Sequence, residues 1–230
     1  MNEEVFHNNQ NKEKPKLLGM LMQPSTEFIK IKQNPVIWKP LIIISILMMI
    51  AGVMTALNID YTNDPEIQEA IQILGMDDRF MLKISALLAG VANLIIPGLT
   101  ALITTVIYLV IAKVIKKPIS FKQLYSMNTY ILFISAIGMI ANGLLSMIIT
   151  KDPSVVLTSL AAVIQTDNMM IKNVLIMVEF FAIWGLVLTI IGLQKVAGFS
   201  KVTATSFVLG FYILSLLFNL FGGWVTTLNI

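Results

Sequence analysis

Residues 84–112 read ISALLAGVANLIIPGLTALITTVIYLVIA, a run of 29 residues without a charged side chain. A helix needs about 20 apolar residues to cross the hydrocarbon core of a membrane. At roughly 1.5 Å per residue, this run would make a helix of about 43 Å, which must tilt, protrude or bend in a bilayer. Pro97 and Gly98 stand near its centre and form the candidate hinge, because proline cannot donate the backbone hydrogen bond of a regular helix. The run therefore predicts a transmembrane helix.

Four further apolar runs extend this interpretation to the whole chain. They are Leu41–Leu57, Met127–Ile149, Asn173–Leu193 and Thr203–Leu228. Of the 230 residues, 57% are hydrophobic and only 13% are charged, and the mean hydropathy is +0.82. A soluble domain has about 25% charged residues, and a core of this size could not hide the apolar excess. We predict an all-α integral membrane protein with five transmembrane helices, the first of which serves as an uncleaved anchor.

The positions of the basic residues predict the orientation of these helices. If the N-terminus lies inside, twelve of the 16 Lys and Arg residues fall in inner segments. The outer segments then hold only Arg79, Lys83, Lys151 and Lys172. Because cytoplasmic loops are enriched in Lys and Arg, we predict an inside N-terminus and an outside C-terminus. The expected location is the plasma membrane of a bacterium.

The chain divides into three predicted parts. Residues 1–16 form a polar tail, residues 17–35 an interfacial amphipathic segment, and residues 36–230 the membrane domain. In the second part, a helix is expected to start at Pro24 and to stop before Pro35. Its apolar residues and lysines suit a membrane surface with anionic lipids, so the lipid bilayer is the first expected partner. Docking of a protein partner is the alternative use of this segment.

Both longer outer loops have the pattern of a short helix. In the first, Asp64 and Pro65 precede an apolar stripe that Gly75 ends. In the second, Asp152 and Pro153 precede apolar residues at helical spacing, namely Val156, Leu160, Val163 and Ile164. We expect two short amphipathic helices on the outer membrane surface. The likeness of the two loops indicates either an internal duplication or a chance similarity between apolar sequences.

The residue inventory excludes several kinds of active site. The chain has no cysteine, and its single histidine, His7, lies in the polar tail, so thiolate chemistry, a histidine-rich metal site and a Ser-His-Asp triad are excluded. Neither a phosphate-binding loop nor a zinc-protease or serine-hydrolase motif occurs. We expect no enzymatic activity, no metal, no cofactor and no nucleic-acid partner.

Glu179 is the one ionisable residue inside a predicted transmembrane run. A carboxyl group in hydrocarbon is costly and normally faces the interior of the bundle. Together with Asn93, Asn142 and Asn219, it could line a polar path for a proton or cation. The alternative is structural: a hydrogen-bonded or snorkelling carboxyl, and asparagines that bond between helices.

The last third of the chain resembles the bacterial branch of the Yip-type family, defined by the Ypt-interacting-protein domain. The resemblance rests on the pattern W-x7-G-L-x2-V-x-G-F-S-x3-A, which begins at Trp184 and includes Gly192, Gly198, Phe199 and Ser200. The stretch from Ser120 to Leu124 and the residues Pro24, Phe28 and Pro35 also resemble this family, so the likeness covers roughly residues 20–225.

The resemblance implies five membrane helices, an inside N-terminus and no catalytic activity. Eukaryotic relatives act in vesicle traffic with small GTPases, but their acidic D-L-Y-G-P-type motif is missing here, so GTPase binding is not carried over. Likeness to one bacterial member implies partnership with the permease and adaptor subunits of an ABC exporter, in resistance to a toxic peptide. The alternative hypothesis is a small transporter or channel subunit with a polar path around Glu179. A lipid-modifying enzyme is the weakest interpretation, since the sequence offers no nucleophile–base pair.

Overall fold

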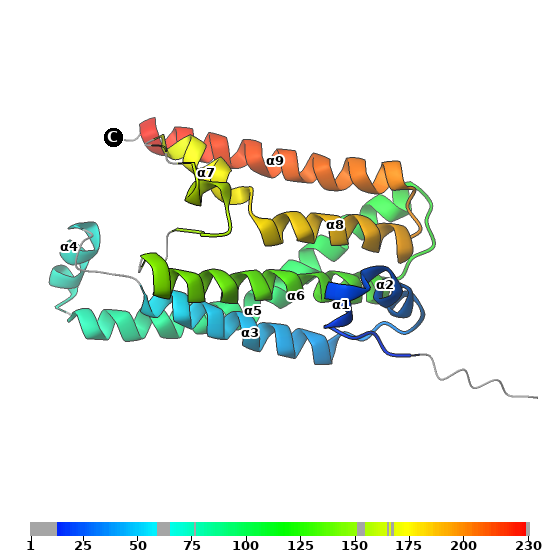
Figure 1. The fold of residues 1–230 in the computed structure, drawn as a ribbon, viewed down its shortest axis with the longest axis horizontal. Coiled ribbons are helices and arrows are strands. Elements are labelled where there is room, and N and C mark those ends of the chain that lie inside the picture. The colour runs from blue at the N-terminus through cyan, green and yellow to red at the C-terminus, as the bar shows by residue number, and fades with distance from the viewer. Residues whose placement is uncertain are drawn as a thin grey trace, which may run out of the picture.

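The structure is a computed structural model that describes residues 13–58, 65–75, 77–150, 155–164, 166 and 168–228. Every regular element in this part of the chain is a helix (Figure 1). The α-helices are α1 (Gly19–Met22), α2 (Pro24–Gln33), α3 (Trp38–Leu57), α4 (Pro65–Leu74), α5 (Asp78–Val114), α6 (Phe121–Leu145), α7 (Met169–Met177), α8 (Phe180–Lys195) and α9 (Lys201–Leu228). A π-helical turn, Ser146–Thr150, extends α6, and a 3-10 turn, Leu160–Ala162, precedes α7.

The long helices lie side by side in one bundle (Figure 1). Helix α3 packs against α5 and α6, α6 packs against α8, and α9 covers α8 and α7. Helices α1 and α2 lie at the end where α6 begins and α8 ends, whereas α4 lies beyond the opposite end (Figure 1). The basic inner segments of the sequence analysis therefore meet at one end of the bundle.

Four helices in the described part are long and apolar enough to cross a membrane: α3, α5, α6 with its π turn, and α9. They confirm the helical interpretation of four of the five apolar runs. Helix α5 is the longest, with 37 residues, and it continues through Pro97. The carbonyl of Gly98, in the next position, accepts a hydrogen bond of 3.1 Å from the Tyr125 hydroxyl on α6. Bending at this pair of residues stays a prediction.

The prediction of one continuous helix over Asn173–Leu193 is wrong. Helix α7 ends at Met177 and α8 begins at Phe180, with Glu179 between them in an extended conformation (φ −120°, ψ 143°). The break is stabilised by backbone pairing with the preceding loop, where the N–H of Leu160 donates to Val178 at 3.0 Å and the N–H of Phe180 donates to Thr158 at 3.1 Å. Glu179 therefore caps a helix of 16 residues instead of lying inside a longer one.

The two outer loops differ in structure. Helix α4 and the positive φ of Gly75 (62°) confirm the first predicted loop helix and its glycine stop. The second predicted helix is wrong, since residues 155–164 form only a three-residue 3-10 turn and a pairing of Ser159 with Glu179. The proposed start signals Asp64, Asp152 and Pro153 lie outside the described residues. The difference between the loops gives the suspected duplication no structural support.

The predicted helix of the segment 17–35 is confirmed as α2, with Pro24 at its start and its end at Gln33, two residues before Pro35. Its apolar side chains Phe28 and Ile31 are completely buried in the core that α6 and α8 contribute. The apolar face of this segment thus packs against the bundle itself. Its contact with a membrane surface stays a prediction.

Candidate functional site

The candidate polar site is a hydrogen-bonded cluster of Asn142, Thr158 and Glu179. Asn142 comes from α6, Thr158 from the loop before the 3-10 turn, and Glu179 from the break between α7 and α8. The backbone N–H of Thr158 donates to Asn142 Oδ1 at 3.1 Å, and Asn142 Nδ2 donates to Thr158 Oγ1 at 2.8 Å. The structure thus brings together two of the four residues that the sequence singled out, and it adds Thr158.

The number of protons that each group carries determines which group donates in these hydrogen bonds. The Thr158 hydroxyl has one proton and donates it to Glu179 Oε1 in a short contact. The second carboxylate oxygen, Oε2, accepts from the backbone N–H of Ala182 at 2.7 Å and so caps α8. Both oxygens of Glu179 therefore have donors, which is the arrangement expected of a structural carboxylate.

A cavity of about 510 Å³ lies beside this cluster. Asn142 and Glu179 contribute to its wall, as do Ser135 of α6 and Tyr212 of α9. The rest of the wall is mainly apolar and includes Phe181. The Tyr212 hydroxyl donates to the carbonyl of Met177 at 3.2 Å, which joins α9 to the end of α7.

Asn93 and Asn219 do not join this cluster. The Asn93 amide donates to the carbonyl of Ala89 at 2.9 Å, and it fills the space that a side chain at Gly52 of α3 would need. Asn219 is exposed on α9 and donates to the carbonyl of Ser215 at 2.9 Å. In the described residues, the four singled-out polar side chains therefore do not line one continuous path.

The glycine-rich motif forms the turn between α8 and α9. Gly192 lies so close to α6 and α2 that an added Cβ would come within 2.9 Å of Met127 Sδ and 3.1 Å of Phe28 Cε1. Gly198 has a positive φ of 69°, and the next N–H, that of Phe199, returns to the carbonyl of Leu193 at 3.1 Å.

The remaining motif residues complete this turn. The Phe199 side chain is buried in the core, and Ser200 Oγ accepts from the N–H of Thr203 at 3.0 Å at the start of α9. Trp184 is partly exposed on α8, with its ring 6.0 Å from that of Phe180. The motif thus specifies a packed turn between two helices, and its residues here serve the fold.

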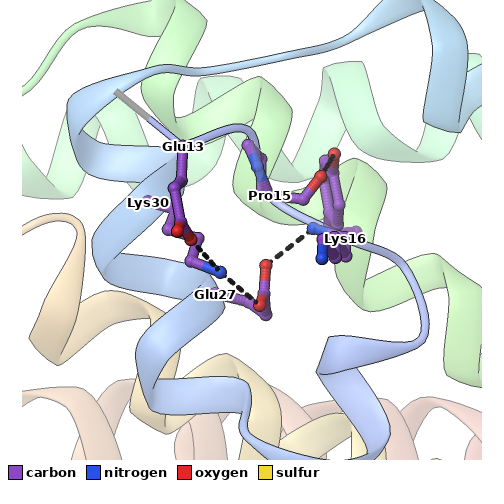
Figure 2. A network of polar contacts seen from close by, with 6 residues as sticks. Glu13, Pro15, Lys16, Glu27 and Lys30 are labelled. Carbon is purple, nitrogen blue, oxygen red and sulfur yellow. Dashed lines mark hydrogen bonds and ion pairs between the residues drawn. The ribbon is translucent and has the colours of Figure 1, made fainter. Parts of the chain in front are cut away.

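A second polar network holds residues 13–33, which we call the N-terminal hook, against the bundle (Figure 2). Its centre is Glu27, whose residue surface is only 4% exposed. Glu27 Oε2 accepts from the backbone N–H of Lys16 at 2.6 Å, and Oε1 accepts from Lys30 Nζ at 3.0 Å. Lys30 Nζ also pairs with Glu13 Oε2 at 3.0 Å.

These contacts shift the pKa values of two groups in the hook. The hydrogen bond from Lys30 lowers the pKa of the Glu13 carboxyl below 4.5. The hydrogen bonds to Glu13 and then Glu27 raise the pKa of Lys30 above 10.5. The spacing of Glu27 and Lys30, three residues apart on a helix, was a sequence signal for this pair. The involvement of Lys16 and Glu13 had no such signal.

Helix α6 supplies the anchor for the hook. The Tyr130 hydroxyl donates to the carbonyl of Pro15 at 2.9 Å, Gln123 Nε2 donates to the carbonyl of Lys32 at 2.7 Å, and Ser126 Oγ donates to the carbonyl of Val36 at 2.7 Å. Gln123 also forms a capping box with Ser120 at the start of α6. Side chains of one helix thereby satisfy two backbone carbonyls of the hook and the carbonyl of Val36, which follows it.

The described residues contain no group of three or more His, Cys, Asp or Glu side chains placed to hold a metal ion. The polar site offers one carboxylate, one amide and one hydroxyl, and the hydroxyl donates to the carboxylate. This arrangement can bind through hydrogen bonds.

The Yip1 domain family model matches residues 18–223. The chain is 30% identical over 218 residues to "Membrane protein YknW" of Bacillus subtilis (strain 168), covering 94% of this chain and 93% of that protein. No solved structure matches the chain.

Proposed function

Because this chain belongs to the Yip1 domain family of membrane proteins, we propose that it is a non-enzymatic accessory protein of an ABC exporter. In this proposal it binds exporter subunits, such as the permease or the adaptor, in the bacterial plasma membrane and supports their assembly or activity. The exporter then contributes to resistance against a toxic peptide. Family membership and the likeness to a Bacillus membrane protein over nearly the whole chain support the proposal.

The observation that carries the proposal is the open face of α9. Only 11% of the most apolar stretch of α9, within Lys201–Leu220, is buried in the structure. This is the lowest share among the four helices that could span a membrane. Helix α9 contacts α7 and α8 and leaves its other side exposed. A helix held by so few neighbours offers a surface to a helix of another protein as well as to lipid.

The exposed side of α9 has residues suited to close helix contact. Ser206 and Gly210 are four residues apart, and both are exposed. Ile213 and Leu217 continue the same helical face and are exposed as well. Small residues at such spacing let two membrane helices approach closely, and large apolar residues beside them supply packing. We assign this face to contact with a transmembrane helix of the exporter permease.

The test is co-purification of a tagged chain with the exporter subunits from cross-linked membranes. Gly210→Leu should lower the recovery of the permease about tenfold and sensitise cells to the toxic peptide, because the added side chain prevents close approach. Ser215→Leu adds similar bulk to a different exposed part of α9 and should leave recovery unchanged. Equal recovery with Gly210→Leu and the unmodified chain would contradict this contact. An exporter that is never recovered would contradict the proposed function.

The cavity beside Glu179 is the observation that favours the second candidate, a transporter or channel subunit. A carboxylate at the edge of a cavity in an apolar bundle is a common form of ion site. Its two oxygens are, however, already occupied by Thr158 and by the N–H of Ala182. We therefore prefer the accessory function, and the Glu179 variants discussed below separate the two candidates.

A further inference from the structure

A second cavity, of about 920 Å³, lies between the N-terminal hook and the beginning of α3. The hook contributes residues 13–18, α3 and the residues before it contribute part of 36–43, and Tyr130 of α6 completes the wall. The cavity lies at the level where α3, the first candidate span, starts at Trp38. It is therefore placed at the boundary between a membrane and the basic end of the bundle.

The wall of this cavity has an excess of positive charge. Lys14, Lys16 and Lys39 line it with exposed side chains, and no ion pair in the described part of the chain involves them. One carboxylate, that of Glu13, also lines the cavity, but its Oε2 is paired with Lys30 Nζ at 3.0 Å. Lys30 is shared between Glu13 and Glu27, as Figure 2 shows. An anion in the cavity would therefore meet three lysines and one carboxylate, so the wall keeps an excess of positive charge.

The start of α3 adds a second attraction for an anion. No side chain caps this helix at Ile37, so the backbone N–H groups of Trp38 and Lys39 lack a side-chain acceptor, whereas Pro40 has no N–H. The partial positive charge of a helix N-terminus also favours an anion at that place. Lys39 stands within this first turn and lines the cavity, so the lysine charge and the helix terminus act at one position.

The other part of the wall is apolar and leads toward the membrane. Leu18, Pro40 and Ile43 line the cavity, and Leu18 is 69% exposed although it is a large apolar side chain. Trp38 is 75% exposed at the start of α3, where tryptophan in membrane proteins meets the lipid headgroups. A soluble anion would gain nothing from these side chains, whereas a lipid would cover them.

We infer that this cavity binds one anionic phospholipid. Its phosphate lies against Lys14, Lys16 and Lys39, and its acyl chains run along Ile43 of α3 and past Leu18. The site joins the hook to the bundle through a lipid that contacts both. Each lysine near a bound anionic headgroup contributes about a fivefold gain in affinity.

The experiment uses the full-length protein in detergent micelles and the fluorescence of Trp38. Trp184→Phe and Trp224→Phe leave Trp38 as the single tryptophan. The protein is titrated with brominated phosphatidylglycerol, which is anionic, or brominated phosphatidylcholine, which has no net charge. We expect half-maximal quenching at a phosphatidylglycerol concentration at least about tenfold lower than for phosphatidylcholine.

The charge is tested with a matched pair of variants. Replacing Lys14, Lys16 and Lys39 together by Gln should abolish the difference between the two lipids, and Lys39→Gln alone should reduce it about fivefold. Replacing Lys113, Lys122 and Lys201 together by Gln removes the same charge from exposed positions outside the cavity, and the difference should persist.

Three results would overturn the assignment. Equal quenching by both lipids in the unmodified protein would exclude a selective site, and this result needs no variant. An equal loss in the two triple variants would indicate general attraction of lipid to a basic surface. Displacement of phosphatidylglycerol by millimolar glycerol 3-phosphate would identify a soluble phosphate as the occupant instead of a lipid.

Discussion

Glu179 shows what one residue decides in this molecule. It follows the C-cap of α7, caps α8 and accepts a hydrogen bond from the Thr158 hydroxyl, and it lies in the break that divides the fourth apolar run into two helices. A glutamate in an apolar run was recognisable as exceptional from the sequence. Its role as a cap was not, because the donor of one of its two hydrogen bonds comes from a loop 21 residues earlier in the chain.

The Glu179→Gln variant should fold and function like the unmodified protein. The amide oxygen of Gln can still cap α8, and its N–H can donate to Thr158 Oγ1, because the Thr158 hydroxyl can turn toward Asn142 Oδ1, 3.0 Å away. Glu179→Leu should destabilise the fold by about 1–3 kcal/mol, since the cap is lost and Thr158 loses a partner. Membrane abundance and toxin resistance measure both variants. A Gln variant that is abundant yet inactive would favour the transporter.

Gly198 and Lys116 make a matched pair at helix ends, since both have a positive φ, of 69° and 57°. Gly198→Ala should lower the free energy of unfolding by about 1 kcal/mol, because a Cβ strains this conformation. Lys116→Gly should raise it by about 0.5–1 kcal/mol for the converse reason, because Lys116 follows the end of α5 in the same conformation. Thermal unfolding in detergent measures both, and a shift of the same sign in the two variants would refute the argument.

At the scale of elements, the sequence was sufficient to predict the helices that apolar composition and local residues at their ends specify. Helix α2 begins at Pro24, and Gly75 follows α4, as the proline and glycine signals indicate. The break in the fourth run was not predictable, because apolar residues on both sides of Glu179 read as one helix. The extended pairing of residues 158–160 with 178–180 overrides that local preference, and such pairing has no signature in a helical period.

The hook is an element whose docking should depend on pH. The contact with Lys30 lowers the pKa of Glu13 in the folded state. The stabilisation of the docked hook by this contact is therefore complete above pH 4.5, and it is lost as the pH falls through the lower pKa of Glu13 in the folded state. A spin label at Leu18→Cys should therefore gain mobility below pH 4.5. Glu13→Gln should remove part of this transition, and an unchanged transition in that variant would show that Glu13 plays no part.

At the scale of the whole molecule, the positions of the helix ends bear on the path of the chain through the membrane. The turn between α8 and α9 lies at the same end of the bundle as α2 and the start of α6 (Figure 1). This arrangement matches the lysine distribution, although α8 itself has only 16 residues. A broken α7–α8 pair can cross a membrane where neighbouring protein covers its non-helical backbone.

Single cysteines test this path, since the native chain contains none. We expect Thr166→Cys to react with a membrane-impermeant thiol reagent in intact cells, and Lys122→Cys and Lys201→Cys to react only after permeabilisation. Thr166 lies before α7 and Lys201 begins α9, so opposite results at these positions require a crossing between them. Labelling of Lys201→Cys from outside would place α9 in the reverse orientation.

The hook also has a consequence for biosynthesis. Phe28 packs against Gly192, and the Pro15 carbonyl accepts a hydrogen bond from the Tyr130 hydroxyl. The hook is therefore held by residues that are synthesised much later than the hook itself. At about 5–20 residues per second, translation needs on the order of ten seconds or more to pass from Phe28 to Gly192. During that interval the nascent hook lacks the part of its core that α8 contributes, so Phe28 and Ile31 stay incompletely covered. Docking of the hook is therefore a late step that marks the completion of α8.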